Sequence, residues 1–147
     1  MAVSASPTPQ PRLELNVPDL ELTIGMKLDV EGNPELCAAI RAMLPLKSLF
    51  GHVVISGDGI WLPSRLVYMG KPVMVTRTIG SVYLNAPGQS ICMTYGAITE
   101  TAVVNEFAHV EDDSLAALKS VGDAVWRRTV TDPVRRSVLG ILREAKD

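Results

Sequence analysis

Residues 81–110 read SVYLNAPGQSICMTYGAITETAVVNEFAHV, and this stretch carries the clearest strand pattern of the sequence. Apolar and polar side chains alternate in three runs, which are separated by Pro87-Gly88 and by Gly96. Alternation with a period of two residues is typical of half-buried strands, and proline and glycine mark the bends between them. The stretch therefore predicts three consecutive strands joined by two turns, with polar groups near the strand ends.

Outside this stretch, further runs alternate or are rich in β-branched residues. Their pattern favours short antiparallel strands that have one face on a core and one face toward solvent. Turn signals at Pro18-Asp19 and at Gly57-Asp58-Gly59 predict hairpins within this set. The runs lie at residues 12–17, 22–30, 50–62, 66–68 and 73–75, which with 81–110 gives about eight strands.

Three segments predict helices. Asn33 can cap a helix that runs to about Leu44 with Pro34 at its first position. Residues 112–114 open a second helix that runs to about Val125, although Gly122 weakens its second half. Residues 131–133 open a third, whose apolar stripe is formed by Val134, Val138, Ile141 and Leu142.

The fold class that follows is mainly β with helices: a closed antiparallel β-barrel of about eight strands with one early helix and two C-terminal helices. Residues 1–11 predict a flexible leader, 12–129 the barrel domain, and 130–147 a C-terminal helix available for oligomerisation. Because that helix offers an apolar stripe beyond the barrel, we expect a homo-oligomer.

Composition narrows the classes of partner. Hydrophobic residues make up 47% of the 147 residues, which suits a packed core. The formal net charge is -2, so the chain lacks the basic surface that binds nucleic acid. No apolar run approaches the roughly 18 residues of a membrane span. We therefore expect a cytoplasmic protein that has a small-molecule substrate and neither nucleic-acid nor membrane partners.

The motifs of several site classes are missing. His52 and His109 are the only histidines and do not have metal-ligand spacing, while Cys37 and Cys92 are predicted to be reduced, buried thiols. Residues 57–59 form a Gly-Asp-Gly turn without the third glycine of a dinucleotide fingerprint, and neither a P-loop nor G-x-S-x-G occurs. The sequence therefore predicts no metal and no cofactor.

Three segments carry a family resemblance: NPELCAAIRAMLP at 33–45, GHVVISGDGIWLP at 51–63 and SVYLNAPGQSICMTYGAITET at 81–101. Together they resemble the cyclophilin-like barrel proteins of the small bacterial type, including the cucumopine-synthase-like group, over roughly residues 12–125. The resemblance implies a cyclophilin-like barrel with a pocket on one side. In the synthase it implies a condensation and ring closure between histidine and a 2-oxo acid. The arginine, phenylalanine and glutamine set of prolyl isomerases has no counterpart here.

His52 is the candidate general acid or base, because imidazole exchanges protons near neutral pH. Glu100, in the turn that follows Tyr95-Gly96, is its candidate catalytic partner or an anchor for a substrate ammonium group. For each the alternative is structural: a histidine bonded to backbone at a strand start, or a solvated loop glutamate. The candidate substrate-binding residues are Tyr95, Thr99 and Asn105 as orienting groups, Trp61 and Tyr83 as an apolar wall, and Arg65 as a carboxylate clamp.

These residues lead to three functional hypotheses. The first is a small metal-free enzyme, a lyase, cyclase or ring-opening hydrolase, that acts on a carboxylated, nitrogen-containing metabolite and makes or breaks a C–N bond by proton transfer. The second is a non-catalytic small-molecule-binding or partner subunit on the same barrel. The third is a peptidyl-prolyl isomerase, which the missing residue set disfavours.

Overall fold

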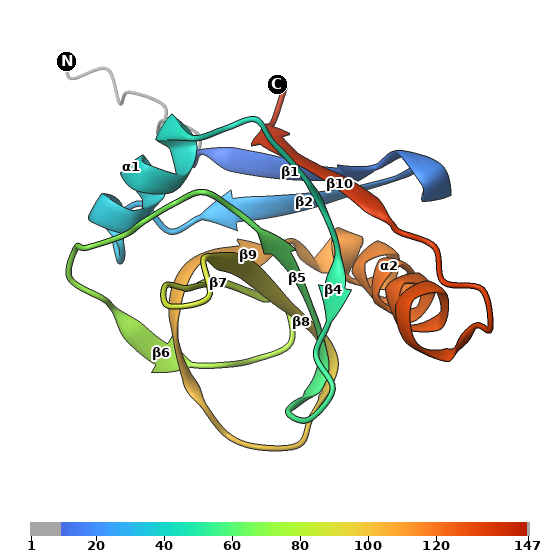
Figure 1. The fold of residues 1–147 in the computed structure, drawn as a ribbon. Coiled ribbons are helices and arrows are strands. Elements are labelled where there is room, and N and C mark those ends of the chain that lie inside the picture. Colours follow the sequence, from blue (N-terminus) through green and yellow to red (C-terminus); the bar gives the residue numbers. More distant parts are fainter. Residues whose placement is uncertain (1–9, 147) are drawn as a thin grey trace, which may run out of the picture.

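The computed structural model describes residues 10–146, so most of the predicted leader lies outside the described residues. Within this range ten strands form one antiparallel sheet. Figure 1 shows how the strands and the two helices are arranged. The strands are β1 (Arg12–Val17), β2 (Leu22–Leu28), β3 (Leu46–Leu49), β4 (Gly51–His52), β5 (Gly57–Pro63), β6 (Met74–Thr76), β7 (Ser81–Asn85), β8 (Ser90–Ile98), β9 (Val103–Val110) and β10 (Leu139–Glu144).

The sheet bends round into a nearly closed barrel. Its strand order is β3-β10-β1-β2-β9-β7-β8-β5-β4, and β6 pairs with β9 outside this path. The two terminal strands, β3 and β4, are separated in sequence by Phe50 alone, so the chain itself links the two edges of the sheet. Closure of this kind leaves few unpaired edges. The mainly β fold with added helices is confirmed.

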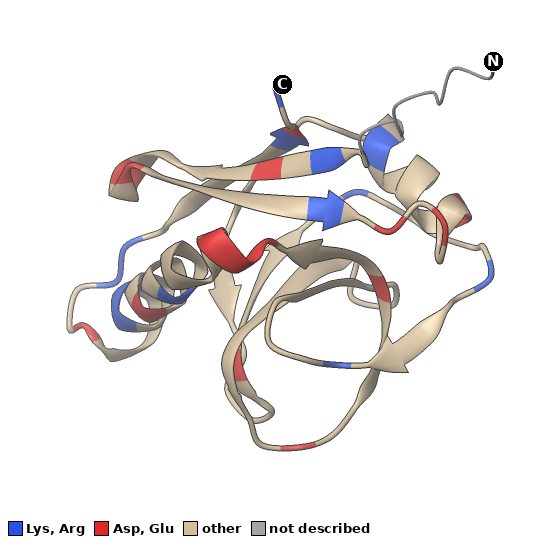
Figure 2. Cartoon of the chain, turned by 180° about the vertical axis from the view of Figure 1, so that it is seen from behind, with Lys and Arg blue, Asp and Glu red and all other residues tan. Residues whose placement is uncertain are grey.

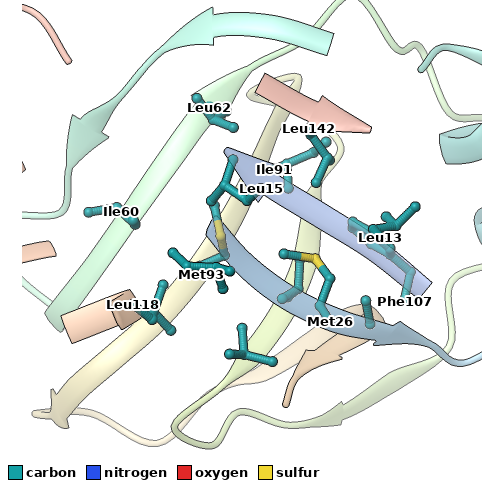
Figure 3. Close-up of a cluster of buried hydrophobic side chains, with 14 of the residues drawn as sticks. Leu13, Leu15, Met26, Ile60, Leu62, Ile91, Met93, Phe107, Leu118 and Leu142 are labelled. Carbon is teal, nitrogen blue, oxygen red and sulfur yellow. The ribbon is translucent and has the colours of Figure 1, made fainter. Parts of the chain in front are cut away.

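Helix α1 (Pro34–Ala42) and helix α2 (Leu115–Trp126) pack on this sheet. Short 3₁₀ turns cover Pro18–Leu20 and Asp112–Ser114, and a π-helical turn (Arg127–Thr131) follows α2. Figure 2 shows charged positions of both signs spread over the strands and helices. The strands and helices enclose a hydrophobic core. It contains side chains from most strands and from α2, including Leu13, Met26, Ile60, Ile91, Phe107, Leu118 and Leu142 (Figure 3).

The three strands predicted within residues 81–110 are confirmed as β7, β8 and β9. They are neighbours in the sheet, with β7 in the middle: Val82 pairs with Met93 of β8 and with Ala108 of β9. On β8 the side chains of Ile91, Met93 and Tyr95 belong to the core, as the alternation requires.

The predicted C-terminal helix is wrong, because residues Leu139–Glu144 form β10 between β1 and β3. Val138 and Leu142 are buried, and a spacing of four residues satisfies both a helical and a two-residue period. Gly140 decides between them: it lies on the same face as its two buried neighbours, against the ring of Phe50, and glycine disfavours a helix interior. The apolar stripe therefore belongs to the core, which removes the ground for expecting a homo-oligomer.

Smaller differences affect the turns. β3 was not predicted, residues 66–68 are not a strand, and the turn of the β4–β5 hairpin lies at 53–56 rather than at Gly57-Asp58-Gly59, which is inside β5. Asn33 precedes α1 as predicted, but its side chain makes no capping hydrogen bond. That side chain instead reaches β9, where Nδ2 donates to the Glu106 carbonyl oxygen at 2.9 Å.

Candidate functional site

A pocket of about 260 Å³ opens where the β4–β5 hairpin, the end of β8 and the end of α2 meet. It brings together a histidine, two aromatic rings and two carboxylates from four separate elements. The lining residues are His52, Val53, Val54, Ile55, Gly57, Asp58, Tyr95, Thr99, Asp123 and Trp126. We call this the His52 pocket.

His52 and Tyr95 form a hydrogen-bonded pair in this pocket. Nδ1 of His52 lies 2.5 Å from the Val53 carbonyl oxygen, which can only accept, so Nδ1 carries the proton in the neutral ring. Nε2 is then an acceptor, and the Tyr95 hydroxyl donates to it at 2.5 Å. This places a base behind a phenol, which is a geometry that can relay a proton.

Two aromatic contacts hold the imidazole in place. The His52 and Trp126 ring centroids are 4.7 Å apart at an interplanar angle of 62°, and those of His52 and Tyr95 are 5.5 Å apart at 78°. Burial, together with the negative charges of Asp58 and Asp123, raises the pKa of Tyr95 to about 12. The phenol therefore stays protonated at neutral pH and acts as a donor.

Gly122 of α2 makes room for the Tyr95 ring. A Cβ atom at Gly122 would lie 2.4 Å from Cδ1 and from Cε1 of Tyr95, which is closer than packed atoms approach. The glycine that weakens the helix is thus explained, because α2 must come close to β8 at this point. The same contact fixes where the Tyr95 hydroxyl lies.

Hydrogen bonds to backbone carbonyl groups tie the two loops of the pocket wall together. Thr99 Oγ1 donates to the Ile55 carbonyl at 3.1 Å. A guanidinium nitrogen of Arg77 donates to the carbonyls of Ser56 at 3.2 Å and Glu100 at 2.8 Å. Arg77 is buried, so these bonds are shielded from water and hold the hairpin turn against the β8–β9 loop.

The charged side chains that line the pocket favour a cation. Asp58 and Asp123 supply two carboxylates, and no lysine or arginine is among the lining residues within 10–146. Asp58 Oδ2 accepts from the Ala97 amide at 3.1 Å, and Asp123 Oδ2 lies 3.4 Å from Lys119 Nζ on the solvent side of α2. Aromatic rings beside two carboxylates are suited to an ammonium group.

Of the predicted site residues, His52, Tyr95 and Thr99 come together in this pocket. Glu100 is exposed and contributes only its backbone carbonyl to the wall. Tyr83 and Asn105 line a different cleft, Arg65 lines a third hollow beside β3, and Trp61 packs against Gly51.

Sequence reasoning did not select Asp58, Asp123 or Trp126 for the site. Asp58 was interpreted only as part of a turn. The available signal was Gly122, since a glycine inside a buried helix indicates a close approach by another element, here by the Tyr95 ring.

Residues 10–146 contain no group of three or more histidine, cysteine, aspartate or glutamate side chains that could hold a metal ion. Among the described helices, none combines the length and the apolar character needed to cross a membrane.

Comparison with known proteins shows a likeness of fold alone. No family model matches the sequence, and no curated protein matches it. Among solved structures, McbB in complex with tryptophan superposes with a TM-score of 0.82 at 24% identity, over 92% of this chain and 45% of McbB. The hypothetical protein AF2241 from Archaeoglobus fulgidus has a TM-score of 0.60 at 20% identity, over 92% of this chain and 95% of its own.

The chain therefore spans less than half the length of McbB. At these identities the two likenesses show a shared fold, the small antiparallel barrel, and this agrees with the barrel predicted from the strand runs of the sequence.

Proposed function

We propose that the protein binds a small aromatic amine in the His52 pocket and makes or breaks a C–N bond of that amine by general acid–base catalysis. The observation that carries the proposal is the 2.5 Å hydrogen bond between Tyr95 Oη and His52 Nε2, beside a pocket lined by two carboxylates. Asp58 and Asp123 would hold the ammonium group, and Trp126 would flank the ring of the substrate.

In this proposal the proton moves through Tyr95 to His52. The phenol gives its proton to Nε2 while its oxygen takes one from the substrate nitrogen, so Tyr95 ends neutral and His52 ends as imidazolium. The pKa of Tyr95, raised to about 12, makes a free phenolate costly, and the relay avoids forming one. The nearby carboxylates would stabilise the imidazolium.

Two further points support an aromatic amine. McbB shares this fold and was determined with tryptophan bound. The resemblance to the cucumopine-synthase-like group implies a condensation of histidine, whose amino group would react, with a 2-oxo acid. The carboxylate predicted for the metabolite has no partner in the pocket, since Arg65 lies in another hollow.

The experiment incubates the protein with tryptamine, tryptophan or histidine, each together with pyruvate or phenylacetaldehyde. Mass spectrometry then detects a product at the summed mass less one water. The proposal expects His52-dependent product from at least one pair. If an amine binds but no product forms, the result would support the non-catalytic binding subunit instead. If no amine binds and no product forms, both hypotheses are contradicted.

A further inference from the structure

A second hollow, the Asn105 cleft, lies between β7, β9 and the segment that leads into β6. Its volume is about 450 Å³, within the range of small-molecule sites. Its walls include Met74, Leu84, Pro87 and Val103, with Tyr83 and Asn105 as polar members. None of the described lining residues is charged. The cleft is therefore suited to a neutral ligand.

Asn105 is oriented without ambiguity. Its side chain is buried, with 5% of its surface exposed. Oδ1 accepts from Asn33 Nδ2 at 2.8 Å and from the Val73 backbone amide at 3.1 Å. Because a backbone N–H can only donate, the atom facing Val73 must be the oxygen. The second bond of Asn33, to the Glu106 carbonyl, fixes the Asn33 amide in the same way.

The remaining polar atom of the Asn105 side chain is the amide nitrogen, Nδ2. Nδ2 makes no hydrogen bond to the described residues, yet it is not one of the fully enclosed unpaired atoms, which are Arg77 Nε, Thr94 Oγ1 and Arg143 Nε. It therefore reaches accessible surface, and the accessible surface beside Asn105 is the cleft. A fixed donor in an apolar wall is satisfied best by an acceptor on a ligand.

We propose that the Asn105 cleft binds a neutral, apolar small molecule that carries one carbonyl group, of the aryl ketone or aryl amide class. The carbonyl oxygen accepts from Asn105 Nδ2, and the ring packs on Met74 and Val103, which are 51% and 59% exposed without a ligand. Burial of such side chains and of the ring supplies most of the affinity. The site is separate from the His52 pocket and does not depend on the function proposed for it.

The test uses ¹⁵N-labelled protein and three probes that share one ring: acetophenone, ethylbenzene without an acceptor, and benzoate with a charge. Acetophenone should shift the backbone amides of Leu84 and Val104 and bind about fivefold more tightly than ethylbenzene, as one neutral hydrogen bond allows. Benzoate should bind least. Equal binding of acetophenone and ethylbenzene, or shifts that gather around His52, would overturn the proposal.

Two variants sharpen this test. Asn105→Asp keeps the oxygen that accepts from Asn33 and Val73 but replaces the free donor, so the preference for acetophenone should vanish. Val103→Asp changes an exposed wall residue and serves if the first variant does not fold; it should abolish acetophenone binding, and retained binding would contradict the proposal. Tyr95→Phe, in the His52 pocket, should leave acetophenone binding unchanged.

Discussion

The His52 pocket and the Asn105 cleft share one feature, a buried polar side chain with a fixed orientation, and differ in the charged groups around it. Each contains a buried polar side chain, Tyr95 or Asn105, that packing and hydrogen bonds hold in one orientation. Around Tyr95 lie a histidine and two carboxylates, whereas the lining of the cleft is apolar apart from uncharged polar groups. Packing thus fixes one polar side chain in each site, while only the His52 pocket surrounds that side chain with the charged groups that the proposed proton transfer requires.

The largest effect is expected for His52→Ala. The variant loses the acceptor for the Tyr95 proton, so kcat/KM for the amine substrate should fall by about 10²- to 10⁴-fold. His109→Ala is the matched control, because His109 is the other histidine and lies outside the pocket, beside Gly80. Turnover assays on both variants, with circular dichroism to confirm folding, make the comparison. Equal losses in both variants would remove His52 from its role.

A methyl group at Gly122 should disturb the pocket from the helix side. The Cβ atom of Gly122→Ala would meet the Tyr95 ring at 2.4 Å, and overpacking of this kind costs about 1 to 3 kcal/mol, more than the helix gains from alanine. Urea denaturation measures the change, with Ser120→Ala on the exposed face of α2 as control. An unchanged or higher stability would show that Tyr95 can move freely.

Arg77→Met should weaken ligand binding at the His52 pocket and leave binding at the Asn105 cleft unchanged. Without the hydrogen bonds to Ser56 and Glu100, the loops of the His52 pocket are held together only by the Thr99–Ile55 hydrogen bond, and amine affinity should fall about tenfold, the value of roughly one hydrogen bond to a charged group. Calorimetry with 2-phenylethylamine measures this. Acetophenone binding at the Asn105 cleft should not change, nor should either affinity in the control Arg65→Met. A parallel loss at both sites would mean that Arg77 supports the whole barrel.

The smallest effect concerns pH. The Tyr95 pKa is about 12 in the folded chain against 10.0 ordinarily, because burial and the carboxylates disfavour the phenolate. Between these values the unfolded chain releases a proton that the folded chain keeps. The contribution of Tyr95 to stability is thus complete below pH 10 and is lost as pH rises toward 12.

Phenylalanine cannot titrate, so the stability of the wild type relative to Tyr95→Phe should decline across this window. Urea denaturation of both proteins at pH 9, 10 and 11 measures the difference. A difference that stays constant with pH would show that the phenol is not shielded from water.

Local pattern was sufficient for the strands between residues 81 and 110, because alternation and turn residues there point to one answer. At the C-terminus it was not, since Val138 and Leu142 fit two periods, and the strand is selected by Gly140 and by the pairing of β10 with β1 and β3. Such pairing joins residues that lie 90 or more positions apart in the sequence, and a local pattern does not contain it.

The candidate site, like the fold, was predicted from the sequence only in part. His52, Tyr95 and Thr99 were predicted together because they lie near bends of neighbouring strands. Asn105 was grouped with them, but the sheet register places it opposite Leu84, which pairs with Ile91, four residues before Tyr95 on β8. Asp123 and Trp126 come from a helix whose approach to β8 is a tertiary contact.

The central claim is that the His52 pocket holds an amine against the His52–Tyr95 pair. Imidazole ¹⁵N NMR during a titration with 2-phenylethylamine tests this most directly, because it requires no knowledge of the reaction. We predict that the Nε2 resonance of His52 shifts with saturation while that of His109 does not, and that 3-phenylpropionate, with its opposite charge, shifts neither. No shift of the His52 Nε2 resonance with 2-phenylethylamine, or an equal shift with 3-phenylpropionate, would contradict the proposed binding of an amine.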